Sequence, residues 1–116
     1  MRGQLGIRLL GVALALVAAA IHLALAVTDL IPGESTRGPA FAATGVGLLA
    51  CAAGLLARRA VADILVALFA GALILAYVAT RDERPVEAIG LTSKAAELGL
   101  AAVAAFLSRR DEDLPL

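Results

Sequence analysis

The chain has 116 residues, of which 61% are hydrophobic and 17% charged, and its ten basic and ten acidic side chains leave no formal net charge. Its mean hydropathy of +0.93 lies well above that of soluble domains. The charge balance excludes the basic surface of a nucleic-acid-binding protein and a polybasic lipid-binding tail. We therefore expect an integral membrane protein, surrounded by membrane lipids and without a nucleic-acid partner.

Four apolar stretches are each long enough to cross a bilayer, since about 20 helical residues span a hydrocarbon core about 30 Å thick. These stretches are residues 9–27, 40–57, 61–79 and 86–107. They use most of the chain, which predicts a single domain over residues 1–116. Only Arg58 and Arg59 form the corner between the second and third helices, so those helices should be antiparallel neighbours. The predicted fold class is all-α: a four-transmembrane-helix bundle with up-down-up-down topology and short loops.

The first apolar stretch has a second interpretation, as a signal peptide. Arg2 and Arg8 form a basic start, and Ala24-Leu25-Ala26 fits a small-x-small cleavage site. The stretch is, however, longer than the ~7 to 15 apolar residues of a signal core, and it contains His22. We expect a retained membrane helix, with cleavage as the alternative.

The basic residues in short connections predict the orientation in the membrane. Six lie at the two ends of the chain and at the corner between the second and third helices: Arg2, Arg8, Arg58, Arg59, Arg109 and Arg110. Three lie in the other two loops: Arg37, Arg81 and Arg84. This excess predicts a multi-pass protein of the cell membrane with both termini on the cytoplasmic side.

One face of the fourth helix is small or polar throughout. Alternating steps of three and four residues from Glu87 reach Gly90, Lys94, Glu97, Ala101, Ala104 and Ser108. The bulky residues fall largely on the other side, where we expect them to face lipid: Ile89, Leu100, Val103, Phe106 and Leu107. Small residues let helices approach closely in lipid, so the small and polar face predicts a packing surface.

Similar stripes run along the other three helices. They are Gly11, Ala15, Ala18, His22 and Asp29; Thr44, Gly47, Cys51, Gly54 and Arg58; and Asp63, Ala67, Ala70, Ile74 and Tyr77. His22 and Lys94 each lie about six residues, or roughly 9 Å, inside the helix end that points away from the termini. We expect a polar layer at this depth, formed by His22, Thr44, Tyr77, Lys94 and Glu97.

Lys94 and Glu97 are three residues apart and should form an ion pair, because a charge at the centre of a membrane helix costs ~2.5 to 3.5 kcal/mol on insertion scales. The pair is either a neutralised contact that fixes helix register, or part of an ion, proton or substrate pathway. His22 alone can supply only one metal or haem ligand. The sequence predicts no catalytic residue, no metal and no cofactor.

Two other residues have simple structural explanations. Asp63 has the charge that is favourable at a helix start, beside Arg59. Cys51, the single cysteine, is expected to be a small packing residue.

Three short segments resemble a known group of proteins. They are Ala20-Ile21-His22-Leu23-Ala24-Leu25, Gly45-Val46-Gly47 and Lys94-Ala95-Ala96-Glu97-Leu98. They are similar to segments of uncharacterised small four-helix integral membrane proteins that are frequent in haloarchaea, although this chain is poorer in aromatic residues and richer in alanine. The resemblance implies the four-helix topology and a role for His22, Lys94 and Glu97, but it names no activity.

Two classes of function fit these features, and a third fits less well. The first is an interaction or accessory bundle that packs with itself, as a homo-oligomer, or with a larger membrane complex. The second is a small oligomeric transporter or channel that uses His22, Lys94 and Glu97. A membrane enzyme is the weakest of the three, because neither a nucleophile nor a metal-ligand set accompanies these side chains.

Overall fold

The structure, a computed structural model, describes residues 2–28, 38–79 and 88–110, and these form four helices with a tight corner between the second and third. The helices are α1 (Arg2–Thr28), α2 (Gly38–Ala57), α3 (Ala60–Ala79) and α4 (Ala88–Arg110). Each contains a stretch of 19 to 23 residues that is long and apolar enough to cross a membrane. The predicted all-α, four-helix class is therefore confirmed. Asp29 and Glu87, and the predicted loops around Pro32 and Arg84, lie outside the described residues.

The corner between α2 and α3 turns on a single residue in the left-handed conformation. Arg58 has φ 56°, which is uncommon for a residue with a side chain but usual just after a helix end. Its N–H donates to the carbonyl of Leu55 at 3.3 Å, and the N–H of Asp63 donates to the carbonyl of Arg59 at 3.1 Å as α3 begins. The chain reverses within two residues, so α2 and α3 are antiparallel and joined closely at this end.

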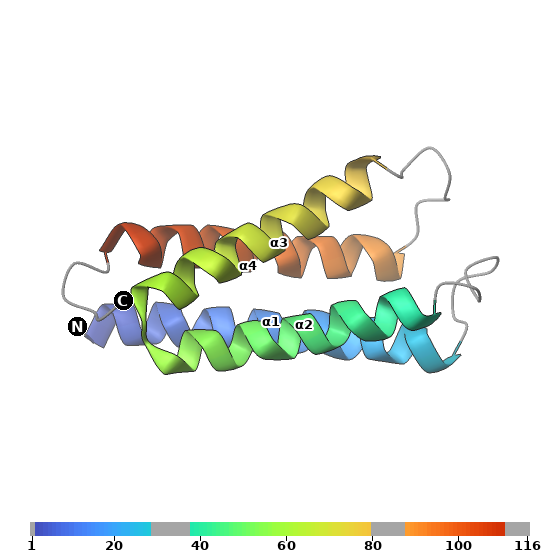
Figure 1. The fold of residues 1–116 in the computed structure, drawn as a ribbon, viewed down its shortest axis with the longest axis horizontal. Coiled ribbons are helices and arrows are strands. Elements are labelled where there is room, and N and C mark those ends of the chain that lie inside the picture. Colours follow the sequence, from blue (N-terminus) through green and yellow to red (C-terminus); the bar gives the residue numbers. More distant parts are fainter. Residues whose placement is uncertain (1, 29–37, 80–87, 111–116) are drawn as a thin grey trace.

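Consecutive helices run in opposite directions along the bundle (Figure 1). The beginning of α1, the α2–α3 corner and the end of α4 lie at one end, which we call the corner end. Helix α1 packs along both α2 and α4, and α3 packs chiefly along α4, whereas α2 and α3 pack only a little against each other. Figure 1 shows α3 tilting away from the other helices toward its own C-terminus. Only 17% of its apolar stretch is buried, compared with 39% for α4.

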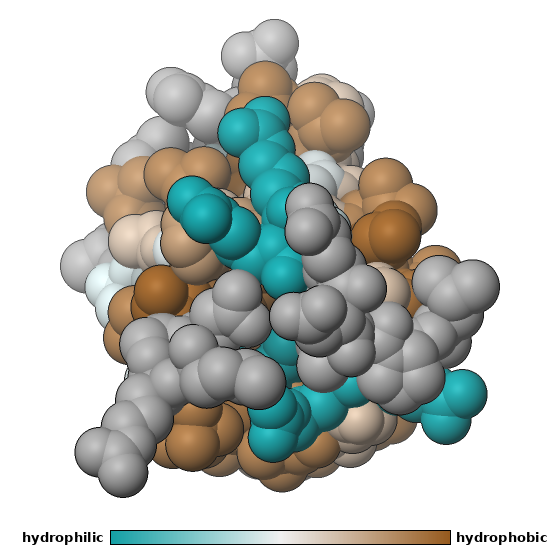
Figure 2. Space-filling view, turned by 90° about the vertical axis from the view of Figure 1, so that its left-hand side faces the viewer, coloured by the Kyte–Doolittle hydropathy of each residue, from teal (hydrophilic) through white to brown (hydrophobic). Residues whose placement is uncertain are grey.

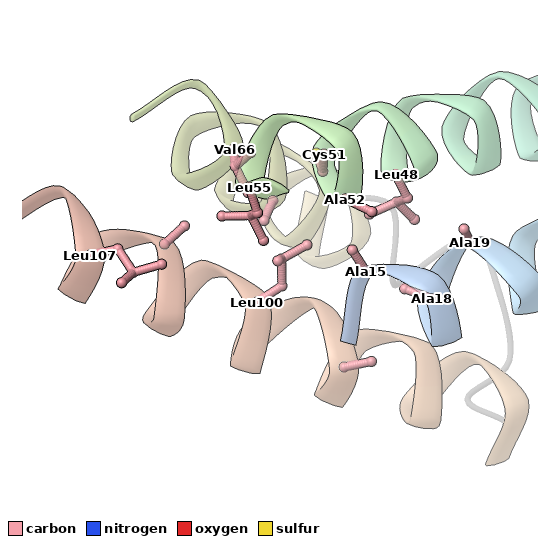
Figure 3. Packing of buried hydrophobic residues seen from close by; sticks show 13 residues of the cluster. Ala15, Ala18, Ala19, Leu48, Cys51, Ala52, Leu55, Val66, Leu100 and Leu107 are labelled. Atoms are coloured by element: carbon pink, nitrogen blue, oxygen red, sulfur yellow. The ribbon is translucent and has the colours of Figure 1, made fainter. Parts of the chain in front are cut away.

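The apolar core lies where α1, α2 and α4 meet, and Val66 and Ala70 of α3 extend it (Figure 3). Alanines on α1, among them Ala15 and Ala18, face the large side chains of Leu48 and Leu55 on α2, and all four are 0% exposed. Small residues opposite large ones allow the close packing that stabilises helices in lipid. The small stripe predicted for α1 is the face that the structure buries.

The lipid-facing side predicted for α4 is wrong for Leu100 and Leu107, which are both 0% exposed. Both belong to the apolar core together with Ala104, so the buried face of α4 includes these three residues. Val103 is also turned inward, because its side chain covers Gly11 of α1. Phe106 remains 40% exposed, as predicted.

Two glycines set close contacts between neighbouring helices. A Cβ at Gly45 of α2 would lie 2.7 Å from the Leu23 side chain and 3.3 Å from the carbonyl oxygen of Ala19, both on α1. A Cβ at Gly99 of α4 would lie 3.0 Å from Leu14 of α1. Gly45 therefore lets α1 and α2 lie this close, because the backbone of Ala19 cannot move aside. At Gly99, a Cβ would require the Leu14 methyl group to shift.

Candidate functional site

A connected group of polar side chains lies inside the bundle toward the end opposite the corner. We call His22 of α1 with Ser93, Lys94 and Glu97 of α4 the histidine cluster. Glu97 is 0% exposed, and its Oε2 accepts a hydrogen bond from the Ser93 hydroxyl at 2.8 Å. The Lys94 ammonium lies 3.0 Å from Oε1 and 2.9 Å from Oε2 of the same carboxylate. The predicted Lys94–Glu97 ion pair is confirmed, and both carboxylate oxygens have donors.

The His22 ring is oriented by its own helix. It is 5% exposed, and its Nδ1 lies 2.8 Å from the carbonyl oxygen of Ala18, one turn earlier. A carbonyl can only accept, so Nδ1 carries the hydrogen and Nε2 is the acceptor of the neutral ring. Ser93 Oγ lies 3.5 Å from the same Nδ1, a long contact by which α4 reaches α1. The ring of Phe41 on α2 meets His22 edge-on, with 6.2 Å between centroids.

Helix α3 approaches the histidine cluster through an aromatic ring. The Lys94 ammonium lies 5.4 Å from the centroid of the Tyr77 ring, which is within cation–π range. The Lys94 side chain is 19% exposed, so it is the least buried of the charged groups in the cluster. Thr44 is partly buried, and within the described residues no hydrogen bond or ion pair joins it to the cluster. The hydrogen bonds, the ion pair and the cation–π contact therefore connect His22, Lys94, Glu97 and Tyr77 of the predicted polar layer, and Thr44 is not among the residues they join.

Ser93 was missed in the sequence, although a signal was present. It lies four residues before Glu97 and therefore on the same helix face, where a hydroxyl can donate to the carboxylate. The stepping pattern that began at Glu87 passed over it. Ser93 is 2% exposed, which makes it an integral part of the cluster.

A second buried polar group, which we call the arginine clamp, lies near the corner end. Arg8 of α1 donates from Nη1 to Oδ1 of Asp63 at 2.7 Å and from Nη2 to Oδ2 at 2.9 Å. Nη1 also donates to the carbonyl oxygen of Leu55 at 2.9 Å. Arg8 is 3% exposed and Asp63 is 0% exposed. The clamp ties α1 to the last turn of α2 and the first turn of α3.

The sequence placed Asp63 correctly in the first turn of α3 but did not pair it with Arg8. The available signal was that Arg8 lies three residues before Gly11 and therefore continues the small stripe of α1. Because a bidentate guanidinium–carboxylate pair is neutral as a unit, it can be buried where either charge alone would be strongly unfavourable.

The two polar groups are each neutral in total charge, which limits their chemistry. Glu97 is balanced by Lys94, and Asp63 by Arg8. Among the described residues, no three His, Cys, Asp or Glu side chains lie close enough together to hold a metal ion. This geometry suits a role in holding the helices together. Proton transfer would require a member of one of these ion pairs to gain or lose a proton.

An apolar groove of about 640 Å³ lies between α2 and α3, where these helices diverge. Its α2 wall is made of small residues, Gly47, Ala50, Cys51 and Gly54. Its α3 wall is bulky and includes Leu65, Leu68 and Phe69. The Phe69 ring lies directly over Gly47, where a Cβ would come within 2.5 Å of it. Cys51 is 6% exposed and packs in this wall, as the sequence predicted.

Comparisons with protein-family models, with curated proteins and with solved structures found no match to this chain.

Proposed function

We propose that this multi-pass membrane protein is an interaction bundle that binds another membrane helix laterally through the outward face of α3. The partner helix belongs to a second copy of the chain or to a larger membrane complex. The six arginines at the corner end support the further proposal that this end, and both termini, lie on the cytoplasmic side.

The observation that carries the proposal is a continuous exposed stripe on α3, which we call the α3 outer stripe. It consists of Ile64, Leu68, Gly71, Leu75 and Val78. The four bulky members are 45% to 71% exposed. Their spacing of four, three, four and three residues is the spacing of a helix–helix seam. The stripe presents ridges on either side of a central glycine, a shape that suits close approach by another helix.

Gly54, Gly71 and Gly99 each follow an alanine by four residues, a spacing that suits close helix contacts, and Gly71 is the one of the three with different surroundings. Gly54 of the Ala50–Gly54 step faces Val66 and Ala62 on α3, and Gly99 of the Ala95–Gly99 step faces Leu14 on α1. A Cβ at Gly71 would have nothing within 4 Å. The bundle's own packing therefore gives no reason for glycine at position 71, whereas contact with a further helix does.

Crosslinking in native membranes tests this proposal. In a Cys51→Ala background, Leu68→Cys and Leu75→Cys should crosslink with a bifunctional thiol reagent, either to a second copy or to a larger partner. The matched control is Leu16→Cys, which places a thiol on the exposed side of α1, where Leu16 is 47% exposed. If the α3 variants stay monomeric, or if the control crosslinks equally well, the proposal fails.

A second candidate, a small oligomeric transporter or channel, is favoured by one observation. The histidine cluster links α1 to α4 through Ser93, and Lys94 at its edge is partly exposed. Such a chain of donors and acceptors can move a proton or bind an ion. Proton and cation flux into liposomes would then disappear in Glu97→Gln and Lys94→Met while folding survives. Unchanged flux in both variants, with Ser108→Ala as the control, would remove this candidate.

A further inference from the structure

We propose that the histidine cluster binds a proton at Nε2 of His22, and that Ser93 links the protonated ring to the Glu97 carboxylate. The inference rests on the second candidate function, which uses the same side chains. It deepens that candidate by naming the proton as the ligand and one ring nitrogen as the binding atom. The contacts that carry it all lie within the described parts of α1 and α4.

The Nε2 atom of His22 can gain a proton without the loss of any contact in the cluster. Both oxygens of the Glu97 carboxylate already accept hydrogen bonds, from the Ser93 hydroxyl at 2.8 Å and from the Lys94 ammonium at 3.0 Å. The carbonyl oxygen of Ala18 holds Nδ1 as a donor at 2.8 Å. The described residues give Nε2 no hydrogen bond, although His22 is only 5% exposed. Buried acceptors usually have a donor, so Nε2 is a site ready to take one up.

The contacts of Nδ1 suit the protonated ring as well as the neutral one. The Ser93 hydroxyl donates its hydrogen to Glu97, so its oxygen can only accept at the ring. The Nδ1–H group therefore has two acceptors, the Ala18 carbonyl oxygen at 2.8 Å and, at the longer distance of 3.5 Å, Ser93 Oγ. A charged donor forms stronger hydrogen bonds than a neutral one, so protonation at Nε2 strengthens both contacts.

The charged groups that face His22 lie on α4 and act in opposite directions. The Glu97 carboxylate favours a positive ring, and the Lys94 ammonium opposes it. Phe41 of α2 contributes an edge-on ring without a formal charge, and Tyr77 of α3 contributes the ring 5.4 Å from the Lys94 ammonium. Glu97 is 0% exposed and fixed, whereas the Lys94 side chain is 19% exposed and can move its charge toward the surface. The protonated cluster therefore retains the carboxylate as the counter-charge of the ring.

The chemistry of proton uptake is simple. A hydronium ion gives its proton to Nε2 and leaves as water, and the new N–H bond is the only covalent change. The cluster then carries one positive charge more than before. A metal ion at Nε2 would need further ligands, and the described helices bring no group of three His, Cys, Asp or Glu side chains together.

The proton site lies nearer the end of the bundle opposite the corner. His22 lies six residues before Thr28, the last residue of α1, and twenty residues after Arg2, the first. These separations correspond to about 9 Å and about 30 Å along the helix. Figure 2 looks onto the corner end, where hydrophilic side chains lie among apolar ones. A proton therefore has the shorter way to the ring from the opposite end.

His22 is the single histidine of the chain, so its ring can be observed without assignment. The full-length protein with isotopically labelled histidine is reconstituted in liposomes, and both ring nitrogens are followed by solid-state NMR as the pH is lowered. The neutral ring should carry its hydrogen on Nδ1, and on acidification Nε2 should gain a hydrogen while Nδ1 keeps its own. A neutral ring with the hydrogen on Nε2, or a ring that gains no second hydrogen before the protein unfolds, would overturn the proposal.

Two variants test the role of the neighbouring charges. Lys94→Met should raise the pH at which half of the rings are protonated by about one unit, and Glu97→Gln should lower it by about one unit. Ser108→Ala is the matched control, because that hydroxyl lies on the same helix and donates to the Ala105 carbonyl at 2.8 Å. It should titrate as the wild type does. Identical titrations of all four proteins would overturn the proposal.

Circular dichroism shows which variants are folded, and the wild-type titration decides alone where a variant does not fold. Flux into liposomes is measured separately. Flux that disappears in Glu97→Gln and Lys94→Met while the wild-type ring takes up no proton would overturn the proton site and leave the transporter candidate standing. Proton uptake with the predicted shifts, in a protein without flux, would support the site and remove that candidate.

Discussion

Arg8 and Asp63, 55 positions apart in the sequence, form a bidentate salt bridge of 2.7 and 2.9 Å that is almost completely buried. The same guanidinium holds the Leu55 carbonyl at 2.9 Å. One side chain therefore fixes α1 against the corner from which both α2 and α3 extend.

Removing one member of the arginine clamp should be more harmful than removing both. Arg8→Met leaves the Asp63 carboxylate buried without its partner, and Asp63→Leu leaves the guanidinium likewise. Each single change should cost about 3–5 kcal/mol in the free energy of unfolding, while the double variant should be much closer to wild type. Unfolding in mixed detergent, followed by circular dichroism, measures this cycle. Additive losses would show that the two side chains do not act as a pair.

Neutralising Lys94 and neutralising Glu97 should lower the stability of the bundle by different amounts. Glu97 is 0% exposed, whereas the Lys94 side chain is 19% exposed and can move its ammonium toward the surface. Lys94→Met should therefore destabilise the bundle more than Glu97→Gln does. Ser93→Ala should cost about 1 kcal/mol, as expected for one hydrogen bond to a carboxylate that keeps another donor. Equal losses for Lys94→Met and Glu97→Gln in the same unfolding assay would contradict the asymmetry.

The sequence was sufficient for features set by composition and by local spacing. Hydrophobic length predicted the four helices, and the three-residue spacing of Lys94 and Glu97 predicted their ion pair. Both follow from physics within one helix, where neighbours along the chain are neighbours in space.

The features that the sequence analysis missed depend on contacts between helices. Leu100 was expected to face lipid because bulky residues usually do, but it is buried in the apolar core. The Arg8–Asp63 pair depends on how the corner lies against α1, which no spacing rule within a helix contains. Helix rotation is set by the fit of several surfaces together, so a pattern read on one helix cannot determine it.

Gly45 should not tolerate even a methyl group, whereas Gly6 should. A Cβ at Gly45 would lie 2.7 Å from Leu23 and 3.3 Å from the carbonyl oxygen of Ala19, while a Cβ at Gly6 has nothing within 4 Å. Gly45→Ala should lower the unfolding temperature by separating α1 from α2. Gly6→Ala should leave it unchanged or raise it, because alanine favours helix by up to about 1 kcal/mol. A smaller loss for Gly45→Ala than for Gly6→Ala would contradict this packing.

The proposed orientation can be tested by thiol labelling of intact cells. In the Cys51→Ala background, Arg58→Cys should be protected from a membrane-impermeant maleimide until the cells are lysed. Arg37→Cys, in a loop that is predicted to lie on the opposite side of the membrane, should be labelled in intact cells. The reverse labelling pattern would contradict the predicted orientation and would show that the basic corner lies on the outer side.

Lateral association through α3 is the central claim, and energy transfer between labelled copies in liposomes tests it most directly. The wild type is compared with Gly71→Ile and with its control, Gly6→Ile, since both glycines face open space within the described bundle. For self-association, Gly71→Ile should weaken transfer at a given protein-to-lipid ratio by about tenfold in apparent affinity, because a branched side chain blocks the close approach of a second helix. Gly6→Ile should match the wild type. Where the partner is a different protein, the same three variants are compared by co-purification from native membranes. Equal association of all three in both formats would contradict the claim.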